Sequence, residues 1–473
     1  MNYAAPKVFV IGLDCAEPDL VFNRWRERLP NLSRLAAAGV SGTLESTIPP
    51  ITVPAWTSMM TGNDPGQLGL YGFRNRKDYS YDALYFADAR YVCEPTVWDF
   101  LSRARRRSIL IGIPQTYPAR PLNGIMVTSF LAPDKGDGFT YPPEMAAEVD
   151  RLAGGDYIVD IKDFRTEDKP WLLEFIYTMT RRRFRVIREL LVKEPWDMFM
   201  FVEMGVDRIH HGFWRYHDPA HRLYQPGNPY ENVIRDYYTY LDGEIGSLLD
   251  ALPNGTVVLV VSDHGAKTMV GGIAINEWLM RNGYLELKEP PGEQAPLKYQ
   301  MIRWERTRAW GEGGYYSRIF MNVQGREPTG VVSPKEYECL RDELTELLEA
   351  MTDEHGQLLG TRVFKPQAIY RECRNIPPDL IVYFGDLDWR SVGSIGSGTI
   401  YHYENDTGPD DANHAQQGLY ILARTSDLGQ APYFGGKRMH RTILDVTPTL
   451  LELFGLEVPR DFSGRSFAND ICA

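Results

Sequence analysis

The chain has few cysteines, no surplus of positive charge and no long hydrophobic run. The cysteines are scattered without a CxxC pair, so neither a disulfide framework nor a zinc knuckle follows. A formal net charge of −12 argues against a general nucleic-acid-binding protein, because it leaves no large basic face. No apolar stretch approaches the length of a membrane span. The five cysteines are Cys15, Cys93, Cys339, Cys373 and Cys472.

The N-terminal segment lacks the layout of a signal peptide. Residues 1–7 are not basic, and the short apolar run that follows them ends at Asp14. We therefore expect a soluble, cytoplasmic protein. A length of 473 residues with 43% hydrophobic content suits one large α/β domain with insertions, or two domains.

An apolar, β-branched run over residues 257–261 leads directly into two residues that commonly bind metals, Asp263 and His264, and then Gly265. Buried parallel strands have this composition, and α/β enzymes place their sites where such strands end. Adjacent residues of a regular strand point to opposite faces, so Asp263 and His264 converge only if the strand stops before them. Glycine permits that break.

Two further apolar runs end in similar residues. Residues 8–13 lead to Asp14, and residues 198–203 are followed by Asp207 and His211. A spacing of four places Asp207 and His211 on one face of a helix. A single Asp at a strand end is also typical of a turn. Together, however, the carboxylates and imidazoles predict a site for zinc, manganese or iron rather than calcium.

Strand-like runs alternate with helical patterns along the rest of the chain. This alternation predicts an α/β fold, a three-layer α/β/α sandwich around a mostly parallel central sheet. We expect one core domain over residues 1–473, with lid or cap insertions near 130–190, 280–306 and 385–412. The helix predicted over 172–193 carries its arginines on its polar side. Other predicted elements are strands at 108–113, 379–384 and 418–423 and a helix at 337–351.

A candidate nucleophile lies in the segment 49–62. Thr52 is predicted to be a helix N-cap, with Pro54 in the first turn and Gly62 at the end. A hydroxyl at this place lies where helix N–H groups favour phosphate oxygens. Metal contact would let the hydroxyl ionise and attack, although a simple capping role is common. The competing hydroxyl residues lie further inside the helix: Thr57, Ser58 and Thr61.

These motifs together resemble the alkaline phosphatase superfamily. The order is Leu13-Asp14, the Thr-x-Pro…Thr-Gly segment from Thr52, Asp207…His211, Ser262-Asp263-His264-Gly265 and a late histidine. The chain is most similar to the branch of type I phosphodiesterases and nucleotide pyrophosphatases and to related predicted phosphohydrolases or phosphomutases. Residues 443–456 resemble the closing helix of the superfamily, so the resemblance covers nearly the whole chain.

The resemblance implies two divalent metal ions, zinc first, with manganese or iron as alternatives. Thr52 would attack phosphorus to form a phosphothreonine, which water would then hydrolyse. His414 completes one ligand set because the strand at 418–423 follows it at the family's spacing, and His402 is the reserve. The implied ligand sets are Asp207, His211 and His414, and Asp14, Asp263, His264 and the Thr52 oxygen.

The chain departs from the family at one substrate contact. Nucleotide pyrophosphatases carry a phosphoryl-contacting asparagine downstream of the nucleophile helix, and Phe73 occupies that position here. Asn75 or a flanking arginine, Arg74 or Arg76, is a candidate substitute. Six aromatic residues are candidates for a pocket wall, although ordinary packing accounts for each alone: Trp214, Trp304, Trp310, Tyr315, Tyr316 and Trp389.

The predicted function is metal-dependent hydrolysis of small-molecule phosphate esters, with diesters ahead of monoesters. We expect no binding to nucleic-acid polymers or to membranes, and the sequence leaves the oligomeric state open. A phosphomutase or phosphomonoesterase that uses the same site is an alternative. A catalytically silent metal-binding module is another, although an intact ligand set with Thr52 argues against it. A sulfatase would need a modifiable Cys or Ser in place of Thr52.

Overall fold

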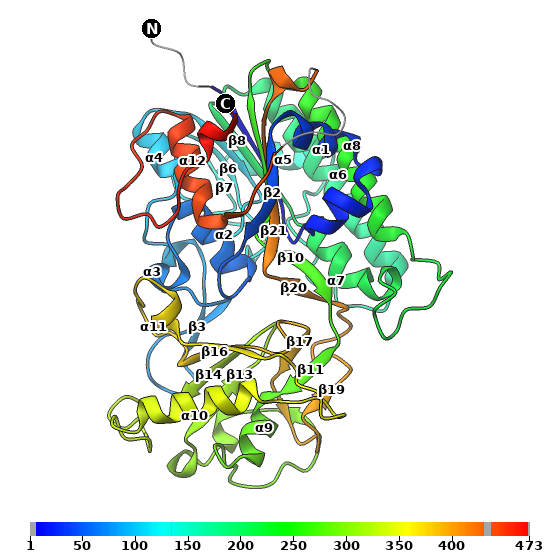
Figure 1. The fold of residues 1–473 in the computed structure, drawn as a ribbon. Helices are drawn as coiled ribbons and strands as arrows, with labels where there is room; N and C mark the ends of the chain where they lie inside the picture. The colour runs from blue at the N-terminus through cyan, green and yellow to red at the C-terminus, as the bar shows by residue number, and fades with distance from the viewer. Residues whose placement is uncertain (1–5, 134, 430–436, 472–473) are drawn as a thin grey trace.

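Parallel strands form the centre of the protein (Figure 1). The computed structural model describes residues 6–133, 135–429 and 437–471. The main sheet has the order β22-β2-β21-β9-β1-β8-β5-β6-β7, with β23 also paired to β2. Its strands are β1 (Val8–Leu13), β2 (Val40–Glu45), β5 (Ser108–Ile111), β6 (Gly124–Val127), β7 (Thr140–Tyr141), β8 (Met198–Glu203), β9 (Val257–Val261), β21 (Gln417–Arg424), β22 (Lys437–Arg438) and β23 (Arg441–Thr442).

The three strands predicted to carry ligands are neighbours in this sheet. β1 lies between β8 and β9 and pairs with both in parallel. Leu13 lies opposite Glu203, and Gly12 lies opposite Val261. The carboxyl ends of the three strands therefore meet at one edge, where α/β folds place their sites.

Helices cover both faces of the main sheet, which confirms the predicted three-layer sandwich (Figure 1). β-branched and aliphatic strand residues are buried between the layers, and one apolar cluster runs through them. The helices on one face are α1 (Pro30–Ala38), α5 (Met145–Ala153), α6 (Lys169–Lys193), α7 (Gly205–His217) and α8 (Val233–Ala251). Those on the other are α2 (Thr52–Thr61), α4 (Val97–Arg103) and α12 (Val446–Leu453).

A second region, residues 269–411, lies beyond the carboxyl ends of these strands (Figure 1). The chain enters it through β10 (Gly265–Thr268) and returns through β20 (Ala412–Ala415), which pair antiparallel. The region has its own apolar cluster. It contains the sheets β13-β14-β16-β15 and β17-β11-β19, made of β11 (Gly271–Ala274), β13 (Ala309–Glu312), β14 (Ser317–Met321), β15 (Arg362–Phe364), β16 (Leu380–Tyr383), β17 (Trp389–Val392) and β19 (Tyr401–His402), with α9 (Ile275–Arg281) and α10 (Tyr337–Glu349).

The second region contains two of the three expected insertions, 280–306 and 385–412. The expected insertion at 130–190 lies elsewhere, because α5 and α6 pack within the core of the main region. Residues 160–165 of this segment reach the candidate site.

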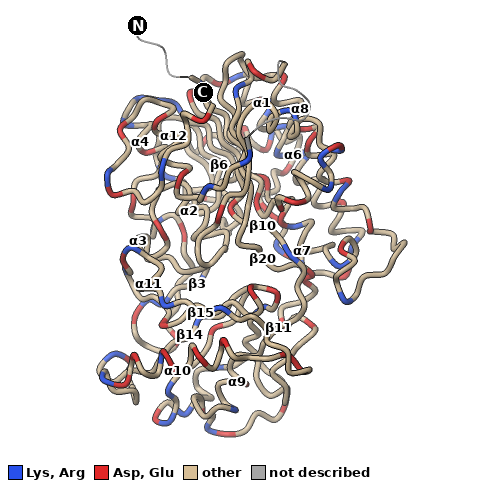
Figure 2. The backbone as a smooth tube through the Cα atoms, viewed as in Figure 1, with Lys and Arg blue, Asp and Glu red and all other residues tan. Residues whose placement is uncertain are grey.

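The structure shows how the charged residues are distributed, whether any helix could span a membrane, and whether the cysteines are paired. Figure 2 shows Lys and Arg interspersed with Asp and Glu in both regions. Among the helices of the described residues, none is both long and apolar enough to span a membrane. The four cysteines that the structure describes are unpaired, and Cys472 lies outside the described residues.

A buried ion pair fixes the start of α7 on the end of β8. The Arg183 guanidinium of α6 lies 3.2 Å from Glu203 Oε1, and both side chains are at most 1% exposed. The same oxygen accepts a hydrogen bond of 2.7 Å from the Gly205 N–H, the first residue of α7. The prediction that the arginines of this helix lie on its polar side is therefore wrong for Arg183.

We expect Arg183→Leu to lower the free energy of unfolding by about 3–5 kcal/mol, because it leaves the Glu203 carboxylate buried without its partner. Arg181→Leu is the matched control, since Arg181 pairs with Glu174 at side-chain exposures of 44% and 73%. That change should cost less than about 1 kcal/mol. Chemical denaturation measures both, and equal midpoints for the two variants would contradict the assignment.

Candidate active site

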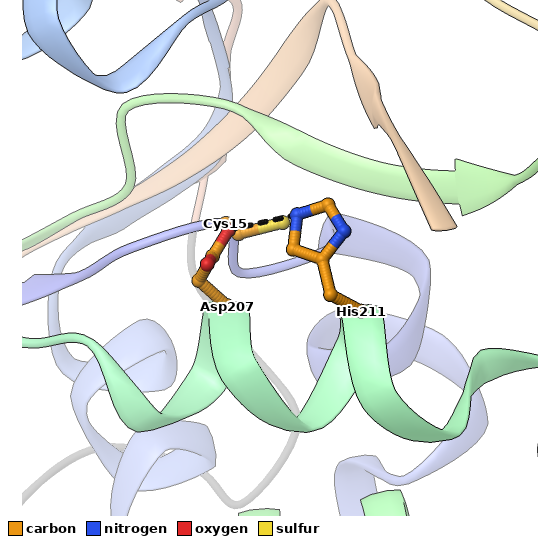
Figure 3. Close-up of side chains that lie close together, drawn as sticks. All are labelled: Cys15, Asp207 and His211. Atoms are coloured by element: carbon orange, nitrogen blue, oxygen red, sulfur yellow. Dashed lines mark ion pairs between the residues drawn. The ribbon is translucent and has the colours of Figure 1, made fainter. Parts of the chain in front are cut away.

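The spacing of Asp207 and His211 places both on one turn of α7, as predicted. Asp207 Oδ1 lies 3.1 Å from His211 Nε2. Both side chains are buried, and Figure 3 shows them on the same face of the helix with Cys15 beside them. Ligand atoms of these three residues lie within 4.8 Å of one another.

The ends of β1 and β9 bring a second group together. His264 Nε2 lies 3.2 Å from Asp263 Oδ2 and 3.9 Å from Asp14 Oδ1. Among the described residues these three buried atoms have no hydrogen-bond partner, whereas the other Asp14 oxygen accepts a hydrogen bond of 2.7 Å from Trp56 Nε1–H. Three orphaned ligand atoms that face one another fit a bound cation.

The structure places His414, and not His402, beside the other candidate ligands. His414 lies on β20, stacks on His264 with ring centroids 3.8 Å apart, and is 5.3 Å from the His211 ring. Its Nδ1 is bonded to the Pro50 carbonyl at 2.7 Å, which leaves Nε2 for a metal. His402 lies on β19 in the second region and contacts Ser397.

The pKa values of the three carboxylates of the site are shifted in different directions. Burial, with the charges of Asp263 and Asp207, raises the pKa of Asp14 well above its usual value. Burial likewise raises the pKa of Asp263. Burial would also raise the pKa of Asp207, but the charges of His211 and Arg208 outweigh it and hold that pKa well below its usual range. A divalent cation between Asp14 and Asp263 would supply the missing positive charge.

Thr52 is the first residue of α2 rather than its N-cap. Ile51 takes the N-cap position, where its backbone is extended. Its side chain forms no capping hydrogen bond. Gly62 ends the helix in the left-handed conformation, as predicted. Within the described part of the chain the Thr52 hydroxyl has no hydrogen-bond partner, whereas the Thr57 hydroxyl donates to the Val53 carbonyl at 2.6 Å. The Thr52 hydroxyl is therefore not committed to a structural bond.

A cavity of about 360 Å³ opens over these residues, between the main region and the second region. Thr52, Asp207, His211 and His414 border it, and the fully buried Asp14, Asp263 and His264 lie behind them. Its other walls are mainly cationic and aromatic. These side chains are Arg74, Lys162, Arg165, Arg208, Arg318 and Arg390, and Phe73, Phe130, Phe164, Tyr315 and Tyr316.

The two proposed substrate contacts take different places. Arg74 lines the cavity, and within the described residues its guanidinium forms no ion pair. Asn75 does not line it. Its side chain accepts a hydrogen bond from the Tyr71 N–H at 2.8 Å and donates to the Gly72 carbonyl at 2.9 Å. The Asn75 side chain therefore holds the preceding loop, while Phe73 itself lines the cavity.

Asp410 supports the histidine of α7. Its only mark in the sequence is an Asp-Asp pair that begins four residues before His414. The carboxylate lies 2.7 Å from His211 Nδ1 and is fully buried. It accepts hydrogen bonds from Arg165 at 2.9 Å and from Tyr315 at 2.7 Å. Burial would lower the pKa of His211, but Asp410 and Asp207 raise it to about 9.

Tyr315 connects the second region to the ligand histidines. Its ring stacks on His414 at 4.3 Å and on His211 at 5.1 Å between centroids. Of the six aromatic candidates, only Tyr315 and Tyr316 line the cavity. The tyrosine and Asp410 both come from residues 269–411, so this region completes the surroundings of the site.

The chain matches a known protein family in sequence and known structures in fold. Residues 8–410 match the family described as type I phosphodiesterase / nucleotide pyrophosphatase. The chain belongs to this family. The sequence resemblance is thereby confirmed, and the protein is a phosphoric ester hydrolase of the phosphodiesterase or pyrophosphatase type. Curated protein sequences show no match to the chain.

Solved structures of family members have the same fold. Human ectonucleotide pyrophosphatase / phosphodiesterase 5 superimposes with a TM-score of 0.54 at 15% identity and covers 98% of both chains. The murine protein of the same name, an inactive variant in complex with AMP, has a TM-score of 0.54 at 13% identity and covers 97% of both chains. At this identity the likeness confirms the alkaline phosphatase-like fold.

We expect Asp410→Asn to weaken zinc binding by about 10–100-fold, because the carboxylate that orients His211 loses its charge. Competition against a chromophoric chelator measures the affinity. Asp388→Asn is the control, since that carboxylate pairs with Lys267 and is 43% exposed. Equal affinities for both variants would contradict a role of Asp410 at the metal site.

The different places of Arg74 and Asn75 predict opposite phenotypes. Arg74→Ala should raise the KM for an aryl phosphodiester about tenfold, because a charged hydrogen bond to the substrate is lost, and should leave the Tm unchanged. Asn75→Ala should lower the free energy of unfolding by about 1–3 kcal/mol through its two lost backbone bonds. Steady-state kinetics and thermal unfolding separate the two, and the reverse pattern would refute the assignment.

Proposed function

We propose that the protein hydrolyses small-molecule phosphate esters, diesters ahead of monoesters, by in-line attack of Thr52 on phosphorus. The observation that carries the proposal is the uncommitted Thr52 hydroxyl in the wall of the cavity that Asp207, His211 and His414 also border. The other hydroxyls predicted as competitors lie further along α2 and do not line the cavity.

The donor set fits two divalent ions, zinc first, with manganese or iron as alternatives. Asp207, His211 and His414 would hold one, and Asp14, Asp263, His264 and the Thr52 oxygen the other. Bound ions would supply Lewis-acid stabilisation of phosphoryl charge and would favour ionisation of the threonine hydroxyl. The support for this is the set of orphaned buried atoms on Asp14, Asp263 and His264.

The chain's own groups account for binding and orientation. The first turn of α2 leaves backbone N–H groups without intrahelical partners, and these suit the phosphoryl oxygens next to Thr52. The arginines of the cavity wall add positive charge around the anionic ester. The aromatic rings leave an apolar surface for the organic part of the substrate.

The reaction proceeds in two displacements. In the first, the bond from Thr52 Oγ1 to phosphorus forms, the bond from phosphorus to the leaving oxygen breaks, and the hydroxyl proton passes to solvent. In the second, water attacks phosphorus and the bond to Thr52 breaks. A monoester gives a phosphothreonine, and a diester gives the same group with one organic substituent retained.

The diester preference is supported by the cavity and by one relative. A cavity of about 360 Å³ with aromatic walls accommodates an organic group in addition to the phosphoryl group. The murine relative is named a pyrophosphatase / phosphodiesterase and is described in complex with AMP, itself a phosphomonoester, which makes nucleotide diesters the first natural substrates to test.

The test is the ratio of kcat/KM for bis-para-nitrophenyl phosphate to that for para-nitrophenyl phosphate on zinc- and manganese-loaded protein. We expect a ratio well above one, and Thr52→Ala should lower kcat/KM for the diester by about 10³-fold or more, as removal of a covalent nucleophile does. Thr61→Val, a change at a buried hydroxyl outside the cavity, is the control. A ratio below one would move the assignment to a phosphomonoesterase or phosphomutase. No turnover that depends on Thr52 would refute the hydrolase mechanism.

A further inference from the structure

Cys15 occupies the position directly after Asp14, at the end of β1. It is fully buried, and its backbone adopts a φ of 65°, a left-handed conformation that favours glycine. The Cys15 N–H donates to Asp263 Oδ1 at 3.2 Å, and the thiol Sγ lies 3.5 Å from the Gly265 carbonyl. The turn therefore fixes the direction of the side chain from both sides.

The thiol lies among metal-binding groups. Ligand atoms of Cys15, Asp207 and His211 lie within 4.8 Å of one another, and Figure 3 shows the sulfur between the carboxylate and the imidazole. Two ligand atoms of one tetrahedral zinc ion lie about 3.5 Å apart, as follows from bond lengths of ~2.0–2.3 Å. Side-chain shifts on the order of 1 Å would thus bring all three groups to one ion.

We propose that Cys15 is a ligand of the metal ion held by Asp207 and His211. This inference rests on the metal site of the proposed function and goes beyond it, because it adds sulfur to a set of oxygen and nitrogen donors. On binding, the thiol proton is released to solvent and a sulfur–metal bond forms, with no change of oxidation state. Zinc accepts a fifth ligand, so the sulfur does not exclude a substrate oxygen.

The sulfur predicts which metal the centre selects. Thiolates favour zinc and other thiophilic ions, whereas manganese and magnesium prefer oxygen donors. We expect removal of the thiol to weaken zinc binding by at least about tenfold, since even groups behind the ligands change affinity by that factor. Manganese affinity should change less than zinc affinity.

Cobalt(II) is the probe for the sulfur–metal bond. Full-length protein is stripped with a chelator and titrated with Co²⁺, and near-ultraviolet absorption reports thiolate-to-cobalt charge transfer. Wild type and Cys93→Ser, a control at an exposed cysteine, should show the band. Cys15→Ser should lack it. A wild-type complex without the band, or a band unchanged by Cys15→Ser, would overturn the proposal.

Two further measurements remove ambiguity. Cys15→Gly suits the left-handed backbone, so it serves if the serine variant does not fold. X-ray absorption at the zinc edge of wild-type protein needs no variant and should show a sulfur neighbour at ~2.3 Å. Its absence would also overturn the proposal. Esterase activity is assayed in parallel, so a sulfur ligand without turnover would refute only the proposed function, and turnover without a sulfur ligand only this inference.

Discussion

Three carboxylates removed from solvent meet at the ends of adjacent parallel strands, and each needs positive charge nearby. The aligned register of β1 with β8 and β9 imposes this meeting, because it places Asp14, Asp263 and the start of α7 at one edge of the sheet. Asp207 has cationic neighbours in Arg208 and His211. Within the described part of the chain, the oxygens of Asp14 and Asp263 that lack a hydrogen bond face only the shared His264, so this pair depends most on a bound cation.

The residues that contact these carboxylates and histidines hold them in place at the edge of the sheet. Trp56 of α2 donates to Asp14, which ties the nucleophile helix to the strand that carries the ligand. Gly12 permits this arrangement, since a Cβ there would lie 2.7 Å from the Trp56 ring. The second region contributes Asp410 and Tyr315, which hold His211 from the other side. The site is thus assembled from both regions, although every expected metal ligand belongs to the main region or to the strand β20 that leads back to it.

Local patterns were sufficient to predict most of the fold and which of the candidate ligands lie close together. The apolar runs at 8–13, 198–203 and 257–261 are strands over almost the same residues, and the spacing of Asp207 and His211 is one turn of helix. These features depend on neighbours in sequence, which a pattern can express. The choice of His414 came from family spacing, not from the residues themselves.

The remaining features depend on contacts between distant residues. Asp410 lies 199 positions from the His211 that it supports, and Arg183 becomes buried only because Glu203 of another element faces it. The Asn75 side chain is engaged by two local backbone bonds that composition does not reveal. A pattern read along one chain cannot express such tertiary partners.

The central claim is that Thr52 forms a covalent bond to phosphorus within this site. The most direct measurement is acid quench of metal-loaded protein during turnover of an aryl phosphodiester, followed by mass spectrometry of the peptide that contains Thr52. The account predicts an added aryl phosphate on Thr52 that appears within one turnover, disappears when substrate is exhausted, and is absent from Thr52→Ala. Full turnover by Thr52→Ala, or an adduct on another residue, would contradict it.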